Sequence, residues 1–317
     1  MNVATLSPLL ACPRCRSGIA LGELRCENES CRYAREPFPA SRGQPILIDF
    51  ESSIFSRSDY EGDKGSVIER DDTGQGLKTR LRLFITGQNK VAAEKSSEML
   101  RRLREAAPRP RVLIVGGGAI GSGLEGFYGA DGVEIVGTDV YASDNTVIVC
   151  DGHRLPFVDE SFDSVWIQSV LQYVLDPSAV AGEIHRVLKP GGLVYADSPF
   201  MQQIAEGGFD FTRFTQSGHR WLFRRFEEID AGYVGNPGSV LTWSIQYFVR
   251  SFGVGDKAAR LASLPFFWLR FLERPSKRRL NADAASGVYF FGCKSGRELT
   301  PKDIISYYET QDGAERS

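Results

Sequence analysis

The chain has 317 residues, of which 42% are hydrophobic, and its 38 Lys and Arg oppose 40 Asp and Glu for a formal net charge of −2. This length can fill more than one domain, and so small a charge argues against a protein that coats nucleic acid by bulk electrostatics. No run approaches the roughly 18 apolar residues of a membrane span, and the start MNVATLSPLLACP lacks the features of a secretory signal. Together with the cysteine spacing described next, these features predict a cytoplasmic protein of at least two domains.

Four cysteines near the start of the chain stand in two close pairs. Cys12 and Cys15 form the first pair, and Cys26 and Cys31 form the second. This spacing suits two knuckles that converge on one tetrahedral Zn²⁺ through four thiolates. We favour that interpretation over unmetallated cysteines or a pair of disulfides. A unit of residues 1–50, with so few apolar side chains, would depend on the metal to fold.

Residues 51–108 connect this segment to an apolar core. Residues 51–78 are polar and contain glycine, which predicts a linker or loop. Residues 90–103 carry a helical apolar pattern, and the Pro-Arg-Pro sequence at 108–110 ends it.

The apolar run Val112 to Val115 predicts a buried strand, and a glycine cluster follows it directly. Gly116, Gly117, Gly118 and Gly121 let the next turn approach a ligand closely, because any side chain there would occupy ligand space. The spacing alone fits a dinucleotide loop as well as an S-adenosylmethionine loop.

Two acidic residues follow the next predicted strands. Asp139 ends the run 133–138, about 20 residues beyond the glycine turn, where a carboxylate can accept both hydroxyls of a ribose. Asp151 and Gly152 follow the short run 146–150, which places a carboxylate at the carboxyl edge of the sheet, where an adenine amine would lie. The sequence therefore predicts an adenosine-containing cofactor.

Later motifs distinguish between the two cofactors. Leu-Pro-Phe at 155–157 is followed by SFDSVWIQSVLQYV at 161–174 and by EIHRVLKPGG at 183–192. Over residues 109–200 this succession resembles the class I S-adenosylmethionine-dependent methyltransferases, especially the ubiquinone and menaquinone biosynthesis branch. The resemblance implies a Rossmann-like α/β methyltransferase domain over 109–295. It assigns the cofactor to Gly116, Gly117, Gly118, Gly121, Asp139, Val140, Asp151, Gly152 and Gln168.

The chain also departs from that family. Ile114 stands where the family often has an acidic residue, and Gln172 with Tyr173 stands where Glu-His is usual. Residues 1–50 in turn resemble the small zinc-ribbon domain that activates tRNA and protein methyltransferases in trans, here fused ahead of the catalytic domain. We favour a structural role for the ribbon and leave open the recognition of a substrate or partner.

A loop after the predicted fifth strand, 193–197, is expected over the reactive end of the cofactor. Asp210 and His219 are the candidates for the base that takes a proton from a hydroxyl acceptor, and Arg213 for the group that holds an anionic part of it. Alternatively, Asp210 and Arg213 pair to close the loop, and His219 caps the following helix.

Strand patterns at 226–233 and 287–293 enclose an aromatic-rich helical insertion at about 238–282. It is expected to be a buried lid, or alternatively a greasy acceptor pocket or an interfacial contact. Residues 296–317 are expected to form a final helix and a tail.

These patterns predict a methyltransferase that transfers a methyl group from S-adenosylmethionine to oxygen of a small-molecule, glycan-like or lipid-linked acceptor. The alternatives are an rRNA or tRNA base methyltransferase and a non-catalytic adaptor that the departures from the family would permit. Nucleic acid is the disfavoured partner, and peripheral contact with a membrane is left open.

Overall fold

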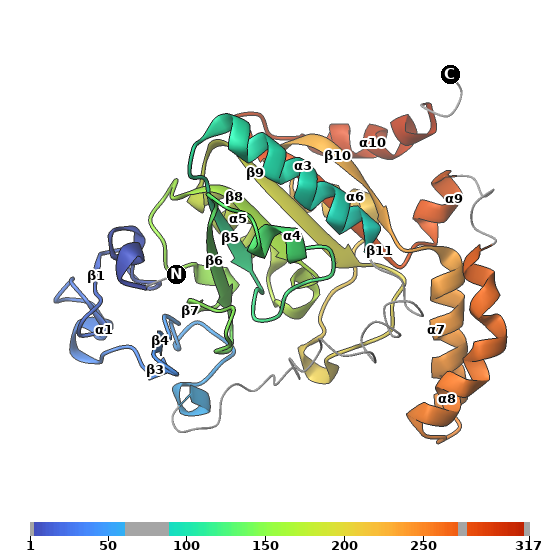
Figure 1. Ribbon diagram of the computed structural model, residues 1–317, viewed down its shortest axis with the longest axis horizontal. Coiled ribbons are helices and arrows are strands. Elements are labelled where there is room, and N and C mark those ends of the chain that lie inside the picture. Colours follow the sequence, from blue (N-terminus) through green and yellow to red (C-terminus); the bar gives the residue numbers. More distant parts are fainter. Residues whose placement is uncertain (1–2, 61–88, 272–277, 314–317) are drawn as a thin grey trace. The chain divides into compact units, whose positions relative to one another are not determined.

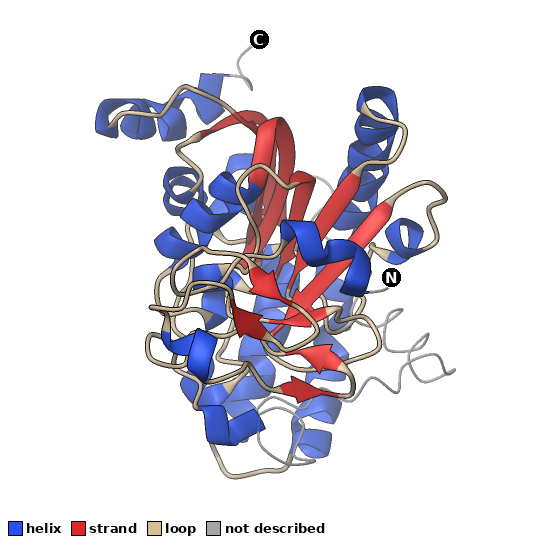
Figure 2. Cartoon of the chain, turned by 90° about the vertical axis from the view of Figure 1, so that its left-hand side faces the viewer, coloured by secondary structure: helices blue, strands red, loops and turns tan. Residues whose placement is uncertain are grey.

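A mixed seven-stranded sheet organises the chain, in the strand order β10-β11-β9-β8-β5-β6-β7 (Figure 2, strands in red). The computed structural model describes residues 3–60, 89–271 and 278–313. They belong to two compact units, whose helices and strands are labelled in Figure 1. The first unit comprises residues 1–168 and 176–194, and the second comprises 169–175 and 195–317. The α/β fold predicted from the sequence is confirmed.

The first unit holds the parallel part of the sheet. Its strands are β5 (Arg111–Val115), β6 (Glu134–Asp139), β7 (Ile148–Val149), β8 (Phe162–Gln168) and the first part of β9 (Leu188–Pro199). β5 pairs in parallel with both β6 and β8, and β6 pairs with β7. Val112, Leu113 and Ile114 are at most 2% exposed, as expected for a central parallel strand covered on both faces.

Three α-helices accompany these strands, namely α3 (Lys90–Ala106), α4 (Glu125–Tyr128) and α5 (Pro177–Val187), with the 3-10 turn η3 (Gly152–Arg154). The side chain of Asn89 accepts the N–H of Ala92 at 3.0 Å and so begins α3 as its N-cap. α3 packs closely on the turn after the glycine cluster, because a Cβ at Gly123 would lie 2.6 Å from the backbone nitrogen of Ala93. The predicted helix at 90–103 is present.

The amino-terminal segment of the same unit is made of short elements, η1 (Val3–Leu9), β1 (Ile19–Ala20), β2 (Arg25–Cys26), α1 (Arg32–Arg35), β3 (Ala40–Ser41), β4 (Gln44–Pro45) and η2 (Arg57–Tyr60). β1 pairs with β2 and β3 with β4, both antiparallel. Ile46 bridges Val149 of β7 in parallel, and the N–H of Ala11 donates to the carbonyl of Pro156 at 3.0 Å. Backbone hydrogen bonds thus attach this segment to the edge of the parallel sheet.

The second unit holds the antiparallel part of the sheet. β10 (Phe226–Val234) pairs with β11 (Gly287–Lys294), with a bulge between Glu228 and Asp230. The unit also contains η4 (Leu171–Tyr173), η5 (Gly207–Phe209), α6 (Gln216–Leu222) and α10 (Pro301–Gly313). Phe223 and Phe290 stack at 5.0 Å in its core.

The insertion between β10 and β11 is helical, as predicted, and contains α7 (Pro237–Arg250), α8 (Asp256–Ser263), η6 (Leu264–Phe271) and α9 (Arg278–Asp283). Two of its aromatic side chains face solvent, since Phe248 is 65% and Phe252 is 71% exposed. The expectation of a buried lid is therefore wrong for these residues. Residues 272–277 of the insertion and 61–88 of the expected linker lie outside the described part of the chain. Within that described part, no helix combines the length and the apolar character needed to cross a membrane.

Candidate functional site

The glycine turn lies directly against the end of β6. The N–H groups of Gly116 and Gly117 donate to the carbonyl of Thr138 at 2.9 and 2.8 Å. Gly116 has a φ of +77°, a conformation that glycine adopts without strain. A Cβ on Gly118 would lie 2.4 Å from the ring of Tyr141, so a side chain has no room at that position.

Asp139, at the end of β6, is fixed beside this turn. One of its carboxylate oxygens accepts the N–H of Gly118 at 2.8 Å, and the other accepts the N–H of Val140 at 2.7 Å. The structure thus brings together the predicted glycine turn, Asp139 and Val140.

Gln168, at the end of β8, approaches the other end of the glycine cluster. A Cβ on Gly121 would lie 2.3 Å from its Oε1, and its Nε2 donates to the carbonyl of Ser122 at 3.2 Å. The indole N–H of Trp166 donates to the Oε1 of Gln168 at 3.4 Å. Gln168 and Gly121, both candidate cofactor residues, are therefore neighbours.

Asp151, which follows β7 and precedes Gly152, is buried and held by two side chains. The Oγ of Ser53 donates to one carboxylate oxygen, and Nδ1 of His153 lies 2.6 Å from the other. Burial alone would raise the pKa of Asp151, but the hydrogen bond and charge of His153 outweigh it and hold that pKa below its ordinary value of 3.8. Asp151 is therefore an ionised acceptor at neutral pH.

Two residues at this end of the sheet had not been expected from the sequence. Ser53 contacts Asp151, and the hydroxyl of Tyr60 donates to the carbonyl of Val140 at 2.8 Å. Both lie in a polar segment with no motif, 98 and 80 residues before their partners, so no local signal indicated them.

The candidate cofactor residues follow the carboxyl ends of neighbouring parallel strands, β5, β6, β7 and β8. That edge is where ligands bind in open α/β sheets. Its backbone donors, two carboxylates and one amide can bind the hydroxyls, amines and charged end of an adenosine-type cofactor. A separate open cavity of about 860 Å³ has none of these residues in its lining, which includes Thr5, Arg109, Tyr128, Glu134 and Asn145.

Asp210 lies in the second unit and forms an ion pair with Arg213. The Nη2 of Arg213 donates to the carboxylate at 2.7 Å, and the N–H of Ala205 donates to it at 2.8 Å. The guanidinium of Arg213 holds the pKa of Asp210 below its ordinary value. These contacts agree with the alternative prediction, in which Asp210 and Arg213 pair to close the loop.

His219 lies within α6, whose N-cap is Thr215. The side chain of His219 is 1% exposed, and its Nε2 lies 3.2 Å from the Oγ of Ser198. The rings of Phe214 and Phe223 pack against it with centroids at 5.6 and 5.2 Å. Burial lowers the pKa of His219 to about 3. The catalytic roles of Asp210 and His219 stay predictions.

The four paired cysteines come together near the start of the chain. The sulfur atoms of Cys12, Cys15, Cys26 and Cys31 all lie within 4.8 Å of one another, and none forms a disulfide. The Sγ atoms of Cys12 and Cys31 are 3.9 Å apart, and those of Cys15 and Cys26 are 3.4 Å apart. Four sulfurs each about 2.3 Å from one Zn²⁺ would be about 3.8 Å apart, whereas a disulfide bond measures about 2.05 Å. The donor set and its spacing fit a tetrahedral thiolate site.

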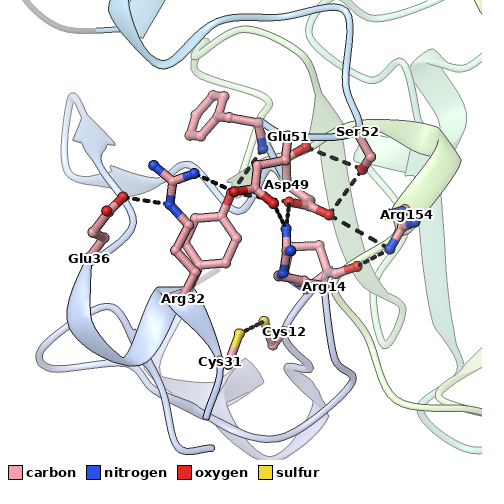
Figure 3. Close-up of polar contacts among 12 residues, drawn as sticks. Cys12, Arg14, Cys31, Arg32, Glu36, Asp49, Glu51, Ser52 and Arg154 are labelled. Carbon is pink, nitrogen blue, oxygen red and sulfur yellow. Dashed lines mark hydrogen bonds and ion pairs between the residues drawn. The ribbon is translucent and has the colours of Figure 1, made fainter. Parts of the chain in front are cut away.

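Asp49 connects the cysteine cluster to the turn after Asp151 (Figure 3). It is 4% exposed and accepts hydrogen bonds from Arg14 at 3.3 Å and from the hydroxyl of Tyr33 at 3.2 Å. Arg154, two residues after Gly152, pairs with the other oxygen at 3.7 Å. Because Arg14 lies between Cys12 and Cys15 in sequence, this buried carboxylate joins the cluster to the candidate adenine end of the site.

Comparison with known proteins indicates the family. Residues 73–196 match the model of the Methyltransferase domain family. The chain is 50% identical over 44 residues to the ubiquinone/menaquinone biosynthesis C-methyltransferase of Desulfotalea psychrophila, which covers 14% of this chain and 18% of that protein. It is 29% identical over 146 residues to the demethylmenaquinone methyltransferase of Corynebacterium glutamicum, covering 43% and 61%.

Among solved structures, a Haemonchus contortus phosphoethanolamine N-methyltransferase 2 bound to S-adenosyl-L-methionine is 20% identical, with a TM-score of 0.42 over 73% of this chain and 61% of that one. The chain spans less than two thirds of the length of either curated relative. The family match covers residues 73–196, which include the parallel strands β5, β6, β7 and β8, so this part of the chain is similar to a methyltransferase domain.

Proposed function

We propose that this protein transfers the methyl group of S-adenosylmethionine to an oxygen atom of a small-molecule or glycan-like acceptor. The observation that carries the proposal is the convergence of the glycine turn, Asp139, Asp151 and Gln168 at one edge of the parallel strands. The match to the Methyltransferase domain covers the same strands.

Each of these residues has a distinct task toward the cofactor. The carboxylate of Asp139, oriented by the N–H groups of Gly118 and Val140, accepts the ribose hydroxyls. Asp151 accepts the adenine amine, and its ionised state suits an acceptor-only role. Gly121 and Gln168 border the methionine end.

Bound S-adenosylmethionine supplies an electrophilic methyl group on a cationic sulfonium. The protein then contributes mainly by aligning the acceptor oxygen with that methyl group, and by removing the proton of a hydroxyl acceptor. Asp210 and His219 remain our candidates for the base. With pKa values below their ordinary ones, both are weak bases, so we expect alignment to contribute more than proton removal.

We also propose that the cysteine cluster binds one Zn²⁺ with a structural role. Four protein thiolates would fill the coordination sphere, which leaves no open position for chemistry. The contacts of Asp49 with Arg14 and Arg154, and of Ser53 with Asp151, support a role in which the metal-bound segment braces the adenine end of the site.

A radiolabel transfer assay tests the proposed reaction. The purified full-length chain is incubated with S-adenosylmethionine labelled on the methyl group and with separate pools of hydroxylated metabolites, glycans, quinone lipids and rRNA or tRNA. We expect label in a small hydroxylated acceptor that is released by cleavage of a methyl ether. Label on the bases of RNA, or on carbon of a quinone ring, would overturn the assignment of the acceptor.

A further inference from the structure

Helices α7 and α8 and the turn between them form a hairpin over residues 237–263. Leu241 and Phe248 lie on α7 and Phe252 lies in the turn that follows it, and these side chains are 49%, 65% and 71% exposed. The rings of Phe248 and Phe252 contact each other edge to face, with centroids 5.2 Å apart. On α8, Leu261 is 68% exposed. The contact between Phe248 and Phe252 makes these two exposed rings one continuous apolar surface, here called the aromatic patch.

The side of α8 turned toward α7 has the opposite character. Ala259 and Ser263 are 1% and 3% exposed, and the Nε2 of Gln246 donates to the Oγ of Ser263 at 2.8 Å. Small and polar side chains therefore hold the two helices together, while large apolar side chains face outward. A helix that faces water has the reverse arrangement, so the outward face is suited to an apolar environment.

The charge of the same region is positive. Residues 237–271 contain four Lys or Arg and a single acidic residue, in a chain whose net charge is −2. That acidic residue, Asp256, is paired with Arg250 at 3.0 Å, while Lys257 and Arg260 are exposed on α8, the helix that follows Phe252 in the chain. Exposed aromatic side chains next to lysine and arginine are the combination that binds the interface of anionic lipid bilayers.

We propose that the α7–α8 hairpin docks the protein on an anionic lipid surface. Phe248 and Phe252 enter the headgroup region, and Lys257 and Arg260 contact the lipid phosphates. A second copy of the chain is a poorer occupant, because a symmetric contact through this face would bring the same cations against each other. The proposal does not depend on methyl transfer. It adds to the proposed function a membrane surface at which the protein acts.

Vesicle co-sedimentation with the full-length protein tests the proposal. Vesicles of pure phosphatidylcholine are compared with vesicles in which half of the lipid is phosphatidylglycerol, at low and at raised salt. We expect binding to the anionic vesicles, weakened by salt because exposed charges are screened. Phe248→Ser combined with Phe252→Ser should weaken that binding by about tenfold or more.

Ile305→Ser provides the matched control, because Ile305 is 69% exposed on α10, outside the hairpin. It should bind vesicles as the parent protein does. Equal binding by the double variant, or no binding of the parent protein to anionic vesicles, would overturn the proposal. A dimer in light scattering that the double variant converts to monomer would assign the face to a second copy instead. Binding of S-adenosylmethionine, measured in parallel, should not change in either variant.

Discussion

At the residue scale, Asp139 is held more rigidly than an ordinary strand end requires. Both of its carboxylate oxygens accept backbone N–H groups, one from Gly118 and one from Val140, and the first of these belongs to the glycine turn itself. The carboxylate is thereby fixed before any ligand arrives, which reduces the entropy lost on binding.

We therefore predict that Asp139→Ala lowers the affinity for S-adenosylmethionine by about tenfold or more, since hydrogen bonds to a charged group contribute about 1.5–3 kcal/mol. Isothermal titration calorimetry measures the loss. Asp131→Ala, an exposed aspartate in the turn before β6, is the matched control and should bind as the parent protein does. Unchanged affinity in Asp139→Ala would remove Asp139 from the site.

His219 makes a prediction about stability and pH. Its pKa is lowered from 6.5 to about 3 by burial, so the unfolded chain takes up a proton between these values while the folded chain does not. The contribution of His219 to stability is fully present above pH 6.5 and declines as pH falls toward 3. Over that window the free energy of unfolding should fall by about 1.4 kcal/mol per pH unit through this residue alone.

Denaturant unfolding at pH 7 and pH 5.5 checks this prediction. His219→Gln, which carries no titratable ring, should show a pH dependence smaller by roughly 1 kcal/mol than that of the parent protein. Parallel pH dependences in the two proteins would mean that His219 is exposed enough to titrate normally. That result would favour His219 as the catalytic base.

At the element scale, several strands and helices could be predicted because their patterns are local. The apolar run at 112–115 is β5, and the periodic segment at 90–103 lies within α3. The fifth strand was expected from residue 193, because Pro190-Gly191-Gly192 resembles a turn, yet β9 begins at Leu188 with Gly191 at a φ of +74°. The expected start of this strand was therefore five residues too late.

Contacts between distant segments could not be read from the sequence. The pairings of Ser53 with Asp151 and of Tyr60 with Val140 depend on how the amino-terminal segment folds back on the sheet edge. No spacing rule encodes that path. The expected burial of Phe248 and Phe252 was wrong for a related reason, because apolar periodicity indicates which residues share a helix face but not what covers that face; the alternative of an interfacial contact allowed for their exposure.

The amino-terminal segment allows a test at this scale. Cys12→Ser should release Zn²⁺ and loosen residues 3–50, because the metal-bound fold of so small a unit depends on all four thiolates. Metal content by mass spectrometry and amide hydrogen exchange over these residues measure both effects. Cys293→Ser, on β11 and outside the cluster, should retain full metal content. Full zinc content in Cys12→Ser would contradict the four-thiolate site.

At the scale of the whole molecule, the candidate residues divide between the two units. The glycine turn, Asp139, Asp151, Gln168 and the cysteine cluster belong to the first unit, whereas Asp210 and His219 belong to the second. All the residues proposed to bind the cofactor therefore lie in the first unit. The choice of acceptor depends on residues for which neither the family match nor the motifs give a specific signal.

The central claim is that the edge of the parallel strands binds S-adenosylmethionine. Calorimetric titration of the purified full-length chain with S-adenosylmethionine, S-adenosylhomocysteine and NAD tests it most directly. We expect binding of both adenosyl ligands and none of NAD, because the sequence motifs that follow the glycine turn resemble those of methyltransferases. Binding of NAD alone, or of none of the three, would contradict the account and leave a non-catalytic adaptor as the better description.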